Sequence, residues 1–278
     1  MRVADFDLDA LPRSTKQGLT LEVTVLPDGS PVTLPVLVAR GGSAGPALLV
    51  LAGVHGDEYE GMRAIWEVYG QLDPAHLHGT FLAVPVANGP AFAAGTRESP
   101  IDHKNLARVF PGSPDGSVTD RIAHALDQYL IARADFLLDL HSAGAKYTMA
   151  TLVGYYHDSS QLGQISQQAA FSFGAPVVWG HPSVGPGRTI SAAMARGIPW
   201  LYAETTGGGW VREHDVQIYT RGVQNLLKHL KMLPGAPDAP SPSYHFVGDG
   251  NTDKAITAQA SGYLVPAVQL LEKVAPGD

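Results

Sequence analysis

The sequence predicts an α/β fold with a mostly parallel or mixed sheet and helices on both of its faces. Short apolar segments alternate with amphipathic segments along most of the chain, and this alternation is typical of strands joined by crossover helices. The chain has 278 residues, of which 45% are hydrophobic and 16% are charged. This length and composition suit one large domain, with room for a small appendage.

Each expected element follows from its local pattern. Short apolar runs predict buried strands, and stretches with apolar residues three or four positions apart predict helices. The strands are expected at Ala47–Ala52, Thr80–Val86, Asp135–Leu140, Thr148–Tyr155, Ala175–Trp179 and Pro199–Ala203. The helices are expected at Gly61–Leu72, Thr119–Ala134, Ser160–Phe171, Thr189–Arg196 and Glu213–Lys231.

Two segments interrupt this pattern. Asn88 to Ser117 is long and rich in glycine, proline and polar residues, and a loop of that length inside a domain is more often functional than idle. Leu233–Ser243 is dense in proline and predicts a linker. We therefore expect a main domain at residues 1–232, a Pro-rich linker at 233–243 and a partial C-terminal β module at 244–278.

Composition limits the classes of partner. The formal net charge is −7 and no run of Lys or Arg stands out, which argues against nucleic acid and anionic membranes as partners. The chain has no cysteine, so any transition metal must bind to His, Asp or Glu. The acidic N-terminus is not a signal peptide, and no apolar stretch reaches the roughly 18 residues that span a membrane. We expect a cytoplasmic protein, and the sequence leaves its oligomeric state open, a homo-oligomer included.

Polar motifs follow three of the expected strands. His55 and Glu58 come directly after the first strand, His141 comes after the third, and Glu204 comes after the last. If a helix begins at the first motif, His55 and Glu58 share one of its faces. Taken alone, this pair fits an acidic helix N-terminus with a chance histidine as well as it fits a metal site.

The conjunction of the three motifs predicts a catalytic metal site. The carboxyl ends of parallel strands meet at the edge where open α/β sheets bind ligands. Two imidazoles and one carboxylate with an open fourth position are a catalytic arrangement for zinc. One Zn²⁺ per chain would lower the pKa of its bound water and polarise a carbonyl group. Glu204, as a free carboxylate, would take the proton of that water and pass it to a leaving amine.

These motifs resemble those of the succinylglutamate desuccinylase/aspartoacylase family, within the wider zinc carboxypeptidase-like fold. The resemblance runs from about Leu48 to the end of the chain. Its motifs are GVHGDEYEG (Gly53–Gly61), GTRESPIDHKNLARVFPG (Gly95–Gly112), DLHSAG (Asp139–Gly144) and the E-T-x-G stretch at Glu204. The resemblance implies an amide hydrolase that acts on a small N-acyl amino acid.

The resemblance also assigns roles to single residues. It implies that His55, Glu58 and His141 are the zinc ligands and that Glu204 is the general base. Arg97 matches the arginine that polarises the scissile carbonyl and its developing oxyanion. Arg108 matches the arginine that binds a substrate carboxylate, a role that suits the two parallel donors of a guanidinium. Without the family, both arginines would pass for ordinary surface residues.

The chain departs from the family at two places. The family's usual Asp-Leu-Asn-Arg is replaced by Asn105-Leu106-Ala107-Arg108. Asn105 is expected to bind substrate together with Arg108. It can also accept an imidazole N–H, but without the charge that raises ligand basicity. Ala107 offers no polar side chain, which leaves the identity of the substrate open. Residues 258–278 resemble only the opening part of the family's small C-terminal β domain, so we expect an incomplete module there.

Other patterns were weighed against this interpretation. Gly41-Gly42-Ser43-Ala44-Gly45 fits the nucleophile motif of serine hydrolases, but it precedes a strand instead of following one, so we interpret it as a loop. The remaining histidines are mostly scattered, as is typical of solvated or structural residues, and His103 in the long loop is the one of interest for function. A carboxypeptidase and a catalytically inactive zinc-binding homologue remain alternatives to the deacylase.

Overall fold

A computed structural model describes residues 1–249, 257–263 and 265–276. The strands are β1 (Thr15–Val25), β2 (Pro31–Arg40), β3 (Ser43–Ala52), β4 (His78–Val84), β5 (Phe136–Ser142), β6 (Leu152–Tyr156), β7 (Val177–His181), β8 (Trp200–Thr205) and β9 (Tyr244–Val247). The α-helices are α1 (Glu60–Gln71), α2 (Gly89–Ala94), α3 (Val118–Ala125), α4 (Gln161–Phe173), α5 (Thr189–Ala195) and α6 (Glu213–His229).

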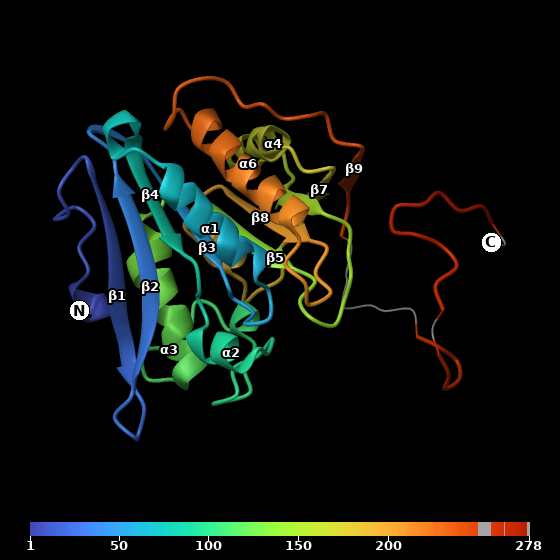
Figure 1. The fold of residues 1–278 in the computed structure, drawn as a ribbon, viewed down its shortest axis with the longest axis horizontal. Coiled ribbons are helices and arrows are strands. Elements are labelled where there is room, and N and C mark those ends of the chain that lie inside the picture. The colour runs from blue at the N-terminus through green and yellow to red at the C-terminus, as the bar shows by residue number, and fades with distance from the viewer. Residues whose placement is uncertain (250–256, 264, 277–278) are drawn as a thin grey trace.

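The described strands form one mixed sheet in the order β1-β2-β4-β3-β5-β8-β6-β7-β9 (Figure 1). At its centre, β3 pairs in parallel with β4 and β5, and β5 pairs in parallel with β8. The pairs β2–β4 and β6–β8 are antiparallel, and they separate this centre from the two flanks of the sheet. The predicted α/β class with a mixed sheet is confirmed.

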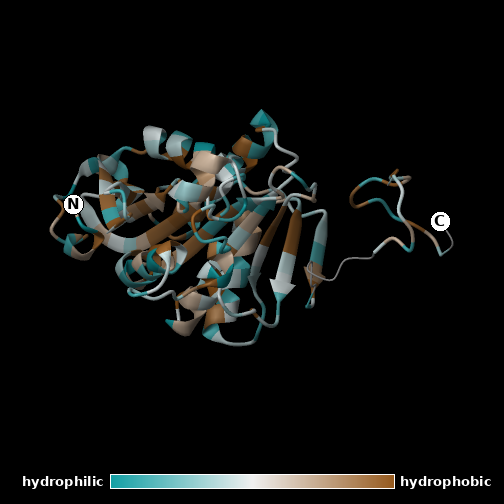
Figure 2. Cartoon of the chain, turned by 90° about the horizontal axis from the view of Figure 1, so that it is seen from below, coloured by the Kyte–Doolittle hydropathy of each residue, from teal (hydrophilic) through white to brown (hydrophobic). Residues whose placement is uncertain are grey.

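Helices cover both faces of the sheet, as the sequence predicts. The face under α1, α4 and α6 packs the apolar side chains of one core cluster, among them Ile65, Phe173 and Tyr219. The opposite face packs against α3, α5 and the segment around Leu106 and Phe110. Figure 2 shows the central strands as hydrophobic, in brown, between helices of mixed hydropathy. Two cores of this kind explain the near-continuous apolar runs of β3 and β5.

The expected helix at Thr119–Ala134 is present but is not α-helical throughout. A capping box between Ser117 and Asp120 starts α3. A π-helical turn at Leu126–Leu130 and a 3₁₀ turn at Ile131–Arg133 then follow. The sequence therefore predicts the position of this segment, whereas its changes of pitch are not visible in the apolar spacing.

The segment between Asn88 and Ser117 is more ordered than the expected loop. Asn88 caps α2, since its side chain accepts a hydrogen bond from the N–H of Ala91 at 3.3 Å, and Pro90 lies in the first turn of the helix. A 3₁₀ turn, η3, covers Leu106–Arg108. Short capped helices of this kind hold the backbone of a long connection in one place.

The N-terminal hairpin was not expected. β1 and β2 pair antiparallel from Thr15 with Arg40 to Val25 with Pro31. The motif Gly41–Gly45 also differs from the expected loop, because β3 begins at Ser43. This serine lies in a strand with no strand-to-helix turn around it, so the arrangement excludes the nucleophile elbow of a serine hydrolase.

The C-terminal part joins the main sheet through one short strand. β9 pairs in parallel with β7, and the described residues after it, 257–263 and 265–276, form no helix or strand. The Pro-rich segment is fixed to α6, because the side-chain amide of Asn225 bonds to both the N–H and the C=O of Asp238. The division into a main domain, a linker and an incomplete β module stays a prediction. No helix in the described residues is long and apolar enough to cross a membrane.

Candidate active site

The first motif forms a tight turn between β3 and α1. Gly53 has a φ of 64°, and a Cβ on Gly56 would lie 2.0 Å from the backbone carbon of Ala91. Both positions therefore require glycine. α1 begins at Glu60, after both residues, so the condition under which His55 and Glu58 would share a helix face is not met. The turn, and not a helix, brings the two side chains together.

Glu58 lies between the two imidazoles. Its Oε1 is 2.8 Å from Nδ1 of His55, and its Oε2 is 2.8 Å from Nδ1 of His141. The three potential ligand atoms lie within 4.8 Å of one another. His55 and Glu58 are only 3% and 2% exposed. The structure thus brings together the three residues that the sequence suggests as metal ligands.

The outer nitrogen of each imidazole also has a partner. Nε2 of His55 is 3.1 Å from Oδ1 of Asn105, and Nε2 of His141 is 3.0 Å from Oδ2 of Asp139. An oxygen acceptor at Nε2 favours the tautomer with its proton there, which leaves the lone pair of Nδ1 free. Thr189 donates a hydrogen bond from its hydroxyl to the same oxygen of Asp139. Both rings therefore present Nδ1 to the space beside Glu58.

The electrostatics of these groups favour a cation. Burial opposes the ionisation of Glu58, but the charges of His55 and His141 outweigh it and hold the pKa of Glu58 below its usual value. Burial likewise opposes the protonation of His141, while Asp139 and Glu58 raise its pKa well above the usual value. The negative charges of Asp139 and Glu58 thus outweigh the burial of His141 and favour a positive charge at this place.

The donor set fits zinc. Two imidazole nitrogens and a carboxylate oxygen are common zinc ligands, and three protein ligands leave a position for water or substrate. Hydrogen bonds from Asn105 and Asp139 supply the outer support that metal-bound histidines usually have. Within the described residues, this is the cluster of His, Asp and Glu side chains whose spacing suits a metal ion.

Glu204 lies beside this cluster, on β8. It is the direct neighbour of His141 across the parallel strand pair, so the two side chains point to the same face of the sheet. Burial raises the pKa of Glu204 to about 8, with Glu58 and Asp139 adding to the rise and His141 and Arg97 opposing it. A carboxyl group at this place can exchange a proton near neutral pH.

Arg97 reaches the same cluster from the segment after α2. Its Nη1 is 3.0 Å from Oε1 of Glu58, and its side chain is 40% exposed. The guanidinium therefore lies at the open side of the cluster, with donors left for another acceptor.

The rest of this segment places Asn105 and Arg108 on either side of Ala107. Asn105 contacts His55, as described above, and accepts from the N–H of Ala107 at 2.9 Å. Ala107 is buried and belongs to the core cluster on the face of the sheet that packs against α3 and α5. Arg108 is exposed and its Nη1 donates to the carbonyl of Ala107 at 3.1 Å. His103 is also exposed and has a φ of 54°.

Sequence reasoning missed four supporting residues. Asp139 and Thr189 support His141, and Tyr219 donates a hydrogen bond from its hydroxyl to the backbone carbonyl of His141. Oδ2 of Asp57 accepts a hydrogen bond from the N–H of Ala145 at 3.0 Å, and thereby connects the motif of His55 to the turn that follows the motif of His141. A signal existed for Asp139, because positions two apart on a strand share a face. The contacts of Thr189 and Tyr219 are long-range and leave no local pattern.

Comparisons with known proteins agree with this geometry. A sequence model of the succinylglutamate desuccinylase/aspartoacylase catalytic domain matches residues 44–230. An N-alpha-acetyl-L-2,4-diaminobutyric acid deacetylase of Halomonas elongata is 32% identical over 88% of this chain and 72% of its own length.

Two solved structures extend the likeness to three dimensions. A succinylglutamate desuccinylase/aspartoacylase of Rhodobacter sphaeroides has a TM-score of 0.84 and 30% identity, over 95% of this chain and 80% of its own. The product-bound ectoine utilization protein EutE (DoeB) of Ruegeria pomeroyi has a TM-score of 0.79 and 29% identity, over 88% and 76%.

Proposed function

Because the chain belongs to the succinylglutamate desuccinylase/aspartoacylase family, we propose that it is a zinc-dependent hydrolase of the amide bond of a small N-acyl amino acid. The observation that carries this proposal is the buried group of His55, Glu58 and His141 with the carboxyl group of Glu204 on the adjacent strand. The names of the relatives, a deacetylase and a desuccinylase/aspartoacylase, support the same type of reaction.

His55, Glu58 and His141 would hold the zinc ion. Bound there, zinc would supply a Lewis acid that lowers the pKa of water and polarises the substrate carbonyl. Glu204 takes a proton from the attacking water and delivers it to the nitrogen that leaves as an amine. One carboxyl group can fill both roles, because its ionised form accepts the proton and its protonated form then releases it.

The arginines act on the charges of the substrate. Arg97, whose guanidinium lies at the open side of the cluster, donates to the carbonyl oxygen as negative charge develops on it. Arg108 binds the carboxylate of the amino acid through parallel N–H donors. Asn105 orients the ring of His55, and its part in substrate binding stays a prediction.

A hydrolysis screen tests the proposal. Zinc-loaded protein is incubated with N-acyl amino acids and with peptides that have the same C-terminal residue, and release of the free amino acid is measured. Hydrolysis of short N-acyl substrates, lost in Glu204→Gln, is the expected result. Equal or faster hydrolysis of the longer peptides would indicate a carboxypeptidase instead. Zinc binding without hydrolysis of either class would indicate an inactive homologue.

A further inference from the structure

The catalytic carboxyl group shares a row of side chains with an apolar cavity. Leu152 on β6 is the antiparallel partner of Glu204, and Val177 on β7 is the parallel partner of Leu152. Residues paired across a sheet point to the same face, with Cβ atoms about 4.5–5.5 Å apart. The face that holds Glu204 therefore continues directly into the apolar surface of β6 and β7.

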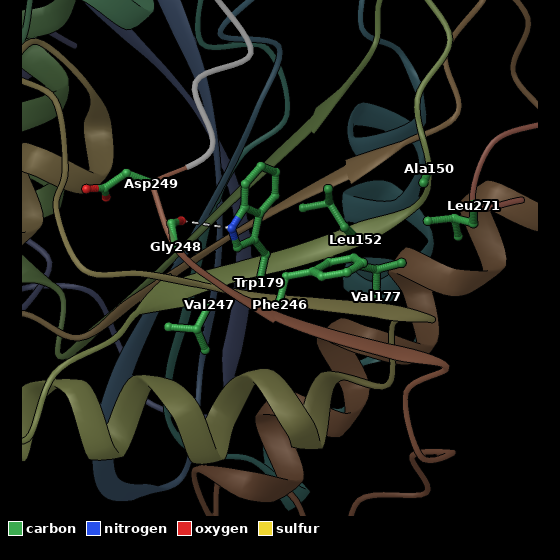
Figure 3. Close-up of a pocket in the computed structure, with 9 residues that line it drawn as sticks. All are labelled: Ala150, Leu152, Val177, Trp179, Phe246, Val247, Gly248, Asp249 and Leu271. Carbon is green, nitrogen blue, oxygen red and sulfur yellow. Dashed lines mark hydrogen bonds between the residues drawn. The ribbon is translucent and has the colours of Figure 1, made fainter. Parts of the chain in front are cut away.

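This surface forms one wall of a cavity of about 500 Å³ (Figure 3). Figure 3 shows Leu152, Trp179 and Phe246 beside one another on the strands, while Leu271 approaches from the C-terminal segment. The indole N–H of Trp179 donates to the carbonyl of Gly248 at 3.0 Å, so this ring offers only apolar surface. A cavity of this size and lining is typical of sites for small molecules.

The chemistry of the proposed reaction decides which part of the substrate lies there. Glu204 must come within hydrogen-bond reach of the leaving nitrogen, so the amino acid portion of the substrate lies next to β8. The side chain of that amino acid then has Leu152, one strand away, as its nearest apolar neighbour along the row. The acyl portion lies on the other side of the scissile bond.

We propose that the cavity between β6, β7, β9 and Leu271 is the subsite for the side chain of the released amino acid. The preferred substrates are then N-acyl derivatives of apolar amino acids, of the size of leucine or phenylalanine. This inference rests on the proposed function and adds the substrate class to it.

Among the described residues of the lining, Asp249 is the charged one, and it defines the competing outcome. It is exposed at the end of the cavity, where it accepts a hydrogen bond from the hydroxyl of Ser183 at 3.0 Å. A cationic side chain that crosses the cavity would pair with it. The apolar walls disfavour this substrate, because its ammonium group would lose water without gaining hydrogen-bond partners from the walls.

A panel of N-acetyl amino acids tests the proposed substrate class. The zinc-loaded protein is compared on N-acetyl-L-leucine, N-acetyl-L-phenylalanine, N-acetylglycine, N-acetyl-L-aspartate and N-acetyl-L-2,4-diaminobutyrate. We expect kcat/KM for the leucine and phenylalanine derivatives to exceed that for the glycine derivative by at least about tenfold, because each additional carbon atom buried in an apolar pocket stabilises the transition state. Equal values for leucine and glycine, or a preference for aspartate or diaminobutyrate, would overturn the proposal.

Two variants locate the effect in the cavity. Ala150 lines the cavity from a half-buried position outside the strands, so Ala150→Trp fills the space. It should lower the leucine-to-glycine ratio of kcat/KM by about tenfold or more. Leu271→Asp places a charge in the opposite wall, on a segment without helix or strand, and should lower the ratio several-fold even if Ala150→Trp fails to fold. Ala132→Trp, on an exposed turn before β5, is the matched control and should not change the ratio.

A binding measurement separates this inference from the proposed function. Calorimetry measures N-acetyl-L-leucine and N-acetylglycine binding to the zinc-loaded Glu204→Gln protein, with and without Ala150→Trp. Suppose that the protein without substitutions hydrolyses no N-acyl amino acid, while Glu204→Gln binds N-acetyl-L-leucine more tightly than N-acetylglycine and Ala150→Trp removes this difference. The subsite is then supported and the proposed function is wrong. Suppose instead that the protein hydrolyses these N-acetyl amino acids, and that Ala150→Trp does not change its preference among them. The proposed function is then supported and the subsite is overturned.

Discussion

His55, Glu58 and His141 are held at the ends of β3 and β5, whereas Arg97 and Arg108 extend from the connection between β4 and α3. Each of these three proposed metal donors contacts another of them on one side, and each imidazole also has an outer partner. Arg97, by contrast, is 40% exposed on its side chain, and Arg108 is exposed as well. The end of β5 and the tight turn after β3 hold the first group, and a surface connection positions the second.

This difference in burial explains which of the two regions tolerates substitutions. A displaced metal donor would leave a buried charge or imidazole without its partner, which is costly. An exposed arginine can move or be replaced with little cost to the fold. The chain keeps the family's metal motif and departs from it in the arginine-bearing segment, at Asn105 and Ala107. Substitutions in the two regions should therefore have effects of different kind and size.

The largest effect is expected from loss of a metal donor. His141→Ala removes one imidazole and leaves Glu58 with one histidine partner, so zinc binding and hydrolysis should both be lost. Activity should fall by at least about four orders of magnitude, to background. Elemental analysis and a hydrolysis assay measure the two quantities, and His103→Ala on the exposed loop is the control. One zinc per chain in His141→Ala would contradict the assignment.

Removal of the general base should separate catalysis from metal binding. Glu204→Gln keeps the shape of the side chain but cannot accept a proton, so kcat should fall by about two to four orders of magnitude. The zinc content should stay at one per chain, because the three donors are unchanged. A variant with nearly full turnover would show that another group moves the proton.

The outer partner of His141 should tune metal affinity without abolishing it. Asp139→Asn keeps an oxygen near Nε2 of His141 but removes the negative charge, and the affinity for zinc should fall by about 10- to 100-fold. Competition with a chelator measures the dissociation constant. Thr189→Val, which deletes the hydroxyl that bonds to Asp139, should lower the affinity less. Unchanged affinity in Asp139→Asn would mean that this carboxylate acts only as a structural acceptor.

Substitutions of the arginines should change substrate binding and leave zinc binding unchanged. A hydrogen bond to a charged group is worth about 1.5–3 kcal/mol, so Arg108→Ala should raise KM for N-acyl amino acids by about tenfold or more. KM for the corresponding amino acid amides should change little, and zinc content should be normal. If acids and amides weaken equally, Arg108 does not bind a carboxylate.

The same two regions differ in how well the sequence predicts them. The buried strands β3, β5 and β8 appear as apolar runs, and a polar motif follows each, so the metal donors and Glu204 can be placed from local pattern alone. The hairpin of β1 and β2 was missed although β1 alternates apolar and polar residues. Prolines at positions 31 and 35 argue against a strand in β2, which has Pro31 at its start and tolerates Pro35 within it.

The contacts around the donors were harder to foresee. Thr189 is 50 residues from Asp139, and Tyr219 is 78 residues from His141. Their meeting depends on how α5 and α6 pack on the sheet, which no short stretch of sequence encodes. Asn88 and the proline after it did signal α2, but the polar composition of the segment hid this short helix. Burial of Ala107 likewise depends on the path of η3 across the core.

The smallest effect, and the one that joins the two regions, is expected at Asn105. This residue belongs to the arginine-bearing segment but contacts a metal donor, since its Oδ1 is 3.1 Å from Nε2 of His55. His141 has a carboxylate in the corresponding place. Asn105→Asp would give both imidazoles a charged outer partner and raise the basicity of His55.

In the Asn105→Asp variant, a carboxylate oxygen would occupy the place of the present Oδ1, which also accepts the N–H of Ala107, so the η3 turn and Arg108 should keep their positions. We expect zinc affinity to rise by up to about tenfold, while KM for carboxylate substrates stays within about twofold. Chelator competition and steady-state kinetics measure the two effects, and Asn105→Ala, which removes the acceptor, should lower the affinity instead. A large rise in KM without any change in zinc affinity would show that Asn105 binds substrate and does not support the metal site. Asn105 would then belong to the arginine-bearing segment in function as well as in sequence.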